Sequence, residues 1–225
     1  SSSHHRHTLL LTSAGIVYSM GDGKAGQLGH GESCRQRSPK IVSYFVENHV
    51  TIKSFACGWK HSVCLSTEGY VWTMGEGKYG QLGNGNLEST CLPSQVPELN
   101  RVTAVRCCWT TTFALTESGE LLGFGKNNLG QLGLGHTINV LLPTRIEHSD
   151  WQLHNVVDVA CGSEHCLCLT NDGGLYVWGW AEHGQLGLKD TQDKLQPTKL
   201  NVSQFPGRIL SIASGGGHSM LICKK

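Results

Sequence analysis

The sequence predicts an all-β protein built from repeated units in a single domain. The tetrapeptide Gly-Gln-Leu-Gly begins at positions 26, 80, 130 and 184, so the units repeat at steps of 54, 50 and 54 residues. The apolar residues between these copies form short runs typical of strands, without the periodicity of amphipathic helices. A tight turn ending in glycine also recurs in each unit. Units of this size cannot bury a hydrophobic face alone, so we expect them to stack on one another.

Each unit is expected to contain four short strands. In the second unit, an alternating run over 62–66 predicts the first strand and an aromatic run over 70–74 predicts the second. Segments around 93–96 and over 102–105 predict the third and fourth. The turn before each second strand ends in a glycine, which supplies the positive φ of a tight antiparallel hairpin. These glycines are Gly15, Gly69, Gly119 and Gly173.

The two ends of the chain depart from this scheme. The first unit is entered midway, with a strand expected over 8–11, and a fifth copy of the first strand follows the fourth unit at 219–223. The aromatic strand expected beside that fifth copy is absent, so we expect it to be unpaired. Open edges tend to recruit another chain, which predicts either a piece of a longer protein or association, with itself or a partner, through open edges. The units are placed at approximately 7–60, 61–110, 111–164 and 165–217, with an extra strand at 218–225.

The Gly-Gln-Leu-Gly copies have an architectural interpretation. Their leucines can insert into the core between sheets, and their glutamines can hydrogen-bond a loop whose amides otherwise lack partners. Glycines that close each second strand permit close approach of neighbouring backbones. The leucines are Leu28, Leu82, Leu132 and Leu186, and the strand-closing glycines are Gly21, Gly75, Gly125 and Gly179.

A second block, small-small-Gly-x-x-His-small, recurs half a unit away from the first. It reads Ala-Cys-Gly-Trp-Lys-His-Ser at 56–62, Ala-Cys-Gly-Ser-Glu-His-Cys at 160–166 and Ala-Ser-Gly-Gly-Gly-His-Ser at 213–219. The third unit deviates, with Arg-Cys-Cys-Trp-Thr-Thr-Thr at 106–112. Together, the two blocks resemble the repeat of the regulator of chromosome condensation family, over essentially the whole chain. The segments 107–112, 161–165 and 178–184 also resemble the secretion-regulating guanine nucleotide exchange factor branch of that superfamily.

The family resemblance implies a β-propeller, usually of seven blades with one four-stranded antiparallel sheet per repeat. About four blades are then present, as a partial arc of a seven-bladed ring. Alternatively, four blades could close as a small propeller, since propellers span about four to eight blades.

The charge balance argues against nucleic acid and anionic membranes as partners. With 18 basic and 17 acidic side chains, the net charge of +1 gives no global field to hold nucleic acid or an anionic membrane. The longest apolar stretches, such as 9–11, are far shorter than the roughly 20 residues that span a bilayer. We therefore expect no membrane insertion and a soluble chain in the cytoplasm or nucleus.

The ten cysteines are interpreted as small buried hydrophobic residues, because most of them lie inside apolar runs. The pair at 107–108 and the Cys-x-Cys spacing at 166–168 do not match the Cys-x-x-Cys pattern of zinc or redox sites. We expect neither a metal nor a cofactor. The cysteines in strand-like runs are Cys57, Cys64, Cys161, Cys166, Cys168 and Cys223.

The histidines of the second block, at 7, 61, 165 and 218, occupy one phase of the repeat. They are interpreted as scaffold residues that satisfy loop amides. Because exchange factors of the family use polar residues on one face, the resemblance keeps a role for His165 or His218 open. No Ser-His-Asp, metal or paired-carboxylate arrangement supports covalent catalysis, which leaves nucleotide exchange as the activity to consider.

The variable residues of two loop rows are the candidates for partner binding, because side chains at loop tips are free to diverge. Within the Gly-x-x-His loops these are Trp59, Lys60, Trp109 and Glu164. The two tryptophans either cover the seams between blades or form an anchor for a protein. In the loops before Gly-Gln-Leu-Gly, the charges form either a solvated rim or a surface that steers a partner. The candidates there are Asp22, Lys24, Lys78, Lys126, Glu182 and His183.

Three functions remain open at this stage. The first is a regulator that binds a protein through one propeller face, with a small GTPase as the partner and nucleotide exchange caused by displaced switch segments. The second is a substrate-recruiting or scaffolding propeller of a ubiquitin ligase or another assembly. The third is a chromatin-binding propeller, which the near-neutral charge disfavours.

Overall fold

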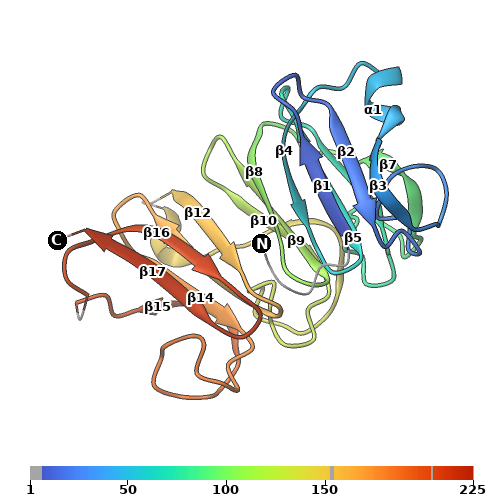
Figure 1. Cartoon of the computed structure of the whole chain (residues 1–225). Helices are drawn as coiled ribbons and strands as arrows, with labels where there is room; N and C mark the ends of the chain where they lie inside the picture. The colour runs from blue at the N-terminus through green and yellow to red at the C-terminus, as the bar shows by residue number, and fades with distance from the viewer. Residues whose placement is uncertain (1–6, 153–154, 204, 225) are drawn as a thin grey trace.

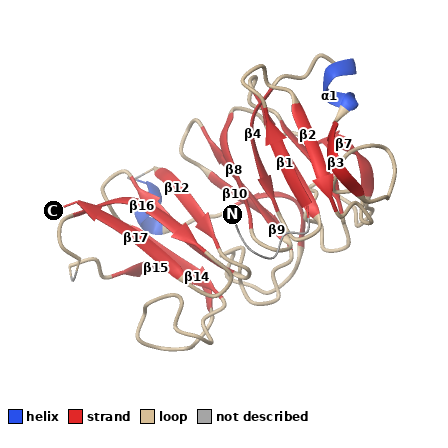
Figure 2. Ribbon diagram, viewed as in Figure 1, coloured by secondary structure: helices blue, strands red, loops and turns tan. Residues whose placement is uncertain are grey.

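The computed structural model describes residues 7–152, 155–203 and 205–224. This part of the chain forms antiparallel sheets that follow one another in sequence order along an open arc (Figures 1 and 2).

The first sheet contains β1 (His7–Leu11), β2 (Val17–Gly21) and β3 (Gln36–Ile41). The second contains β4 (Ile52–Cys57), β5 (His61–Ser66), β6 (Val71–Gly75) and β7 (Thr90–Gln95). The third contains β8 (Val102–Cys107), β9 (Thr111–Thr116), β10 (Leu121–Gly125) and β11 (Val140–Arg145). The fourth contains β12 (Val156–Cys161), β13 (His165–Thr170), β14 (Leu175–Gly179) and β15 (Lys194–Leu200), and the fifth β16 (Arg208–Ser214) and β17 (Ser219–Lys224).

Each four-stranded sheet is a meander of consecutive strands. From the second sheet onward, the first strand of each sheet contacts the first strand of the next. Strand β4 contacts β8, β8 contacts β12, and β12 contacts β16. The sheets therefore stand side by side as blades, and the all-β propeller architecture expected from the repeat is confirmed.

The predicted strands of the second unit agree with β5, β6, β7 and β8 to within three residues at either end. The hairpin glycines have the positive φ that was expected, from +78° at Gly15 to +87° at Gly69. Strand β8, which ends the second sequence unit, pairs with β9 of the next. The sequence repeat is thus offset by one strand from the sheets, and its approximate unit boundaries stay a prediction.

The expectation of an unpaired strand at the C-terminal end is wrong. Strand β17 pairs with β16, from Ser214 opposite Ser219 to Arg208 opposite Lys224. The segment before the last histidine block supplies this partner, just as β12 supplies one to β13. Within the described residues no strand covers the other edge of β17. Lys225, the last residue of the predicted extra strand, lies outside the described residues.

Two short helices in the described part of the chain were not predicted. Helix α1 (Ser43–Glu47) follows β3, and the 3₁₀ helix η1 (Ser149–Gln152) follows β11. Helix α1 has no side-chain cap and spans little more than one turn, so its local sequence favours it only weakly. It is held instead by Phe45, which is buried in the first core cluster.

The hydrophobic core is divided into four clusters, and each fills the seam between two successive sheets. The first joins residues such as Leu9 and Ile52, and the second joins Val63 and Val105. The third and fourth lie on either side of the fourth sheet. The four Gly-Gln-Leu-Gly leucines are at most 1% exposed, which confirms their predicted core role. None of the helices in the described ranges has the length and hydrophobicity needed to cross a membrane.

Candidate protein-binding face

The Gly-x-x-His loops of neighbouring blades are joined by backbone hydrogen bonds. The amide of Trp59 donates to the carbonyl of Trp109 at 2.8 Å, and the amide of Trp109 donates to the carbonyl of Ser163 at 3.2 Å. The amide of Ser163 donates in turn to the carbonyl of Gly216 at 3.0 Å. These bonds hold the loop tips of four successive sheets beside one another, at one end of the blades.

The second row of variable loops meets the first at this same end. The amide of Glu76 donates to the carbonyl of Lys60 at 2.9 Å, and the amide of Lys126 donates to the carbonyl of Thr110 at 3.0 Å. Strand pairing explains the contact. Gly75 at the end of β6 lies opposite His61 at the start of β5, and Gly125 at the end of β10 lies opposite Thr111 at the start of β9. The two rows, which lie about a third of a unit apart in the sequence, therefore form one surface.

Aromatic rings and lysines gather where the second and third sheets adjoin. The rings of Trp59 and Trp109 are 6.1 Å apart at 32°, and both residues are half-buried. The ammonium of Lys60 lies 4.5 Å from the Trp59 ring centre, and that of Lys78 lies 4.9 Å from the ring centre of Tyr79. The Lys126 ammonium approaches Tyr79 from the next blade, at 5.7 Å. We call this surface the aromatic-basic patch; its members are Trp59, Lys60, Lys78, Tyr79, Trp109 and Lys126.

Two carboxylates lie beneath the lysines of the aromatic-basic patch. Glu76 accepts ion pairs from Lys60 at 3.4 Å and Lys78 at 3.5 Å. Glu164 pairs with Lys126 at 3.0 Å and also accepts a hydrogen bond from the Gln131 amide. The carboxylate side chains are 13% and 11% exposed, whereas the lysine side chains are 36%, 48% and 23% exposed. A partner approaching this face would therefore meet ammonium groups and aromatic rings before it met carboxylates.

Five of the sequence candidates come together in the aromatic-basic patch: Trp59, Lys60, Trp109, Lys78 and Lys126. Glu164, expected at the surface, is buried beneath Lys126. Tyr79 and Glu76 were not singled out. Both stand in the variable row before the second Gly-Gln-Leu-Gly, so their row was identified but their pairing with other blades was not visible in the sequence.

Four other candidates lie in loops of the first and fourth sheets. The amide of Lys24 donates to the carboxylate of Asp22 at 3.4 Å. The indole of Trp180 donates to Glu182 at 3.3 Å, and its ring lies 4.8 Å from that of His183. Their part in partner binding stays a prediction.

The repeated histidines reach across the seams between sheets, and their expected contact with loop amides stays a prediction. Nε2 of His61 hydrogen-bonds the Thr112 hydroxyl at 3.0 Å, and that hydroxyl donates to the Gln81 carbonyl at 2.8 Å. His7 with Ser62 and His165 with Ser219 repeat the contact at 2.8 and 3.1 Å.

His165 and His218 occupy the same repeat position in different surroundings. Burial, together with the nearby charge of His218, lowers the pKa of His165 to about 4. His218 is exposed on the last sheet. A role for either residue on a polar binding face stays a prediction.

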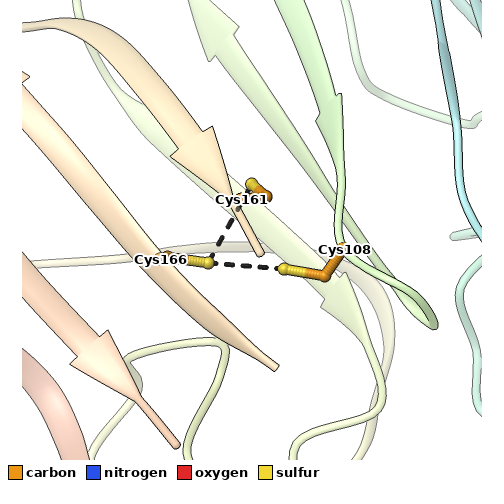
Figure 3. A group of neighbouring side chains, drawn as sticks. All are labelled: Cys108, Cys161 and Cys166. Carbon is orange, nitrogen blue, oxygen red and sulfur yellow. Dashed lines mark hydrogen bonds between the residues drawn. The ribbon is translucent and has the colours of Figure 1, made fainter. Parts of the chain in front are cut away.

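The buried cysteines include Cys64, Cys108, Cys166 and Cys168, in keeping with the packing interpretation. Three thiols from two sheets nevertheless converge: Cys108, Cys161 and Cys166 (Figure 3). Sequence spacing could not reveal this cluster, because Cys108 lies more than 50 residues from its nearest thiol partner.

Comparisons with known proteins agree with this architecture. The chain is 32% identical to the human E3 ubiquitin-protein ligase HERC2 over 214 residues, covering 95% of this chain and 4% of HERC2. It is 44% identical over 221 residues to a bifunctional serine/threonine-protein kinase/NEDD4-like E3 ubiquitin-protein ligase of Dictyostelium discoideum, covering 97% of this chain and 11% of that protein. The crystal structure of Prp20p from Saccharomyces cerevisiae, described with its binding properties to Gsp1p and histones, superposes with a TM-score of 0.81 at 27% identity, covering 97% of this chain and 54% of that one.

The chain thus spans only part of the length of these similar proteins. The RCC1-like domain matches residues 2–221, nearly the whole sequence. Together with the meandering blades and the repeated histidine and Gly-Gln-Leu-Gly blocks, this match shows that the chain belongs to the RCC1-like domain family.

Proposed function

We propose that this chain is a protein-recognition propeller whose aromatic-basic patch binds a protein partner. The observation that carries the proposal is the Trp59–Trp109 ring pair, which two adjacent blades present at one end of the arc. Tryptophans are enriched among the residues that dominate the binding energy of protein interfaces. Backbone hydrogen bonds fix both loops, so little conformational entropy would be lost when a partner binds.

The charge of the aromatic-basic patch favours an acidic protein surface as the partner. Its three lysines are more exposed than the carboxylates they pair with, so their positive ends remain available to a partner. Charge complementarity of this kind raises association rates and sets orientation more than it raises affinity. Nucleic acid is a weaker match, because the net charge is only +1.

The specific partner we propose is a small GTPase, with nucleotide release promoted by displacement of its switch segments. The similarity to Prp20p supports this proposal, since that protein is described with its binding properties to Gsp1p. No covalent catalysis is needed, and the chain would act from the cytoplasm or nucleus.

Binding and exchange can be tested separately. Nucleotide release would be measured for a panel of small GTPases with the chain, with the variants Trp59→Ala and Trp109→Ala, and with Tyr70→Ala as a control. Tyr70 is 39% exposed and precedes β6 at the end of the blade opposite the aromatic-basic patch. We expect faster nucleotide release from one of the GTPases, lost with the two tryptophan variants and kept with Tyr70→Ala. Unchanged release rates across the panel would refute exchange. Equal binding of a captured partner by all four proteins would refute the role of the patch.

A ubiquitin-ligase context is the second candidate. It is favoured by the two E3 ligases whose sequences align with 95% and 97% of this chain. In that setting the aromatic-basic patch would recruit a substrate or hold a ligase subunit. Affinity capture that recovers ligase subunits with the chain, but not with Trp109→Ala, would support this function.

Chromatin binding is a third candidate, and it can be separated from the other two. The similarity to Prp20p, which is described with histone binding, motivates a test with histones and with DNA. DNA binding through phosphates would weaken steeply with added salt, whereas an aromatic protein contact would respond much less.

A further inference from the structure

The seam between the third and fourth sheets lacks the imidazole-hydroxyl hydrogen bond found at the other seams. Where those seams carry a histidine, the third sheet has Thr111. Where they carry the hydroxyl of Ser62, Thr112 or Ser219, the fourth sheet has the thiol of Cys166. Both partners of the hydrogen bond are therefore exchanged together at one seam.

A third exchange accompanies these two. Among the blocks at 56–62, 106–112, 160–166 and 213–219, the glycine is replaced only in the third sheet, by Cys108. At Gly162 an added Cβ would overlap the imidazole of His165, so the glycine and the histidine fit together there. With Thr111 in place of the histidine, the space beside residue 108 accepts a side chain. The Cys108 thiol then points toward Cys166, where the imidazole would otherwise have met a hydroxyl.

Cys161 completes a cluster of three thiols at this seam (Figure 3). The Cys166 sulfur lies 3.5 Å from that of Cys108 and 3.9 Å from that of Cys161, and all three sulfurs lie within 4.8 Å of one another. Cys161 ends β12 and faces Cys166 of β13 as its register partner, while Cys108 follows β8 of the neighbouring sheet. Two sheets therefore hold the sulfurs in place before anything binds.

The separations between the sulfurs suit a metal ion. With metal-sulfur bonds of about 2.3 Å, thiolate sulfurs are about 3.8 Å apart around a tetrahedral ion and about 4.0 Å apart around a trigonal one. The 3.5 and 3.9 Å separations need changes of only a few tenths of an ångström to match. The third separation, within 4.8 Å, needs a contraction of at most about 1 Å.

The surroundings leave the sulfurs available as ligands. The Gln131 carbonyl accepts a hydrogen bond from the Trp178 indole at 2.9 Å, so it does not depend on the long 3.6 Å contact from the Cys166 thiol. Burial opposes ionisation of Cys161, but hydrogen bonds from the other two thiols and the charge of Arg106 lower its pKa. Burial raises the pKa of Cys108 and Cys166, so uptake of a cation would have to displace their protons.

We propose that Cys108, Cys161 and Cys166 form a metal site between two blades, and that its ligand is a thiophilic cation, copper(I) being the best match. Soft sulfur donors select copper(I) and zinc over harder ions. Structural zinc sites almost always use four protein ligands, and in the described part of the chain the cluster contains three. Copper(I) accepts three sulfurs in a plane. The bound ion would fasten the third blade to the fourth, in place of the hydrogen bond that this seam lacks.

The test is a competition titration with copper(I) under anaerobic, reducing conditions. The chain competes with a chromogenic copper(I) chelator, alone and as the variants Cys161→Ser and Cys166→Ser. Serine already occupies the equivalent positions at Ser214 and Ser219, so both variants should fold. Cys57→Ser is the matched control, because Cys57 holds the position of Cys161 in the seam between the first and second sheets, where His7 contacts Ser62.

We expect one tightly held copper(I) per chain and a rise in the thermal midpoint when it binds. Cys161→Ser and Cys166→Ser should each weaken retention at least tenfold and abolish that rise, while Cys57→Ser changes neither. Equal retention by all four proteins would overturn the site, because the copper would then be bound elsewhere. Retention of zinc but not of copper(I) would overturn the choice of ion.

Discussion

Acidification is expected to weaken the seam between the fourth and fifth sheets, because the buried imidazole of His165 takes up a proton poorly in the fold. Burial lowers its pKa from the ordinary 6.5 to about 4, and the charge of His218 acts in the same direction. The unfolded chain binds the proton more readily, so the stability is complete above about pH 6.5 and is lost as the pH falls toward about 4. The loss from this one residue is about 2 kcal/mol at about pH 5 and about 3 kcal/mol at about pH 4.

The effect can be isolated with His165→Gln, which removes the titrating ring and keeps an amide that can reach Ser219. Urea unfolding would be followed by tryptophan fluorescence at about pH 7.5 and about pH 5. Titrating groups that do not interact with His165 contribute equally to both proteins, so the wild-type chain should lose about 2 kcal/mol more than the variant between the two conditions. His183→Gln, which changes an exposed histidine, should behave like the wild type. An equal loss in wild type and His165→Gln would refute the reasoning.

Two further substitutions test packing and buried charge. Leu132→Ala removes a side chain that is 0% exposed and should lower the free energy of unfolding by about 2–5 kcal/mol, measured by urea unfolding. Leu142→Ala, at a site 50% exposed, should change it by less than about 0.5 kcal/mol, and similar losses for the two would contradict the assigned core. Glu164→Gln should cost about 1–3 kcal/mol, because it takes the charge from the carboxylate that holds Lys126 at 3.0 Å. A double-mutant cycle with Lys126→Met measures that coupling, and a coupling of zero would contradict it.

The strands and their recurrence from unit to unit could be predicted because they depend on local patterns. Runs such as 62–66 and 70–74 carry the alternation and aromatic content of strands, and Gly69 between them can only be a turn. The burial of the Gly-Gln-Leu-Gly leucines could also be predicted from the repeat, since every unit needs an apolar side chain that inserts into the core between sheets. The pairing of β17 with β16 was not predicted, because the sequence analysis looked for a partner only in an aromatic strand that would follow β17. The actual partner, β16, precedes it.

The candidate site was only half visible in the sequence. Its residues could be proposed because Trp59, Trp109 and the lysines stand at the variable positions of blocks that otherwise repeat. Their grouping could not be, because it depends on contacts between blades, such as Lys126 over Tyr79. Glu164 shows the limit most clearly. Its position in a variable loop suggested exposure, yet Lys126 and Gln131 from the same inter-blade seam cover it.

By itself, the sequence determined the repeat, the strands and the turns, because these follow from hydrophobic alternation and glycine over a few neighbouring residues. Only the tertiary structure decided what lies across each seam: a hydroxyl beside most of the histidines, two tryptophans side by side, and three thiols where a histidine is missing. These contacts join residues about 50 positions apart, and their distances depend on how one sheet rests on the next. The pattern of residues along the chain does not specify these distances between neighbouring sheets.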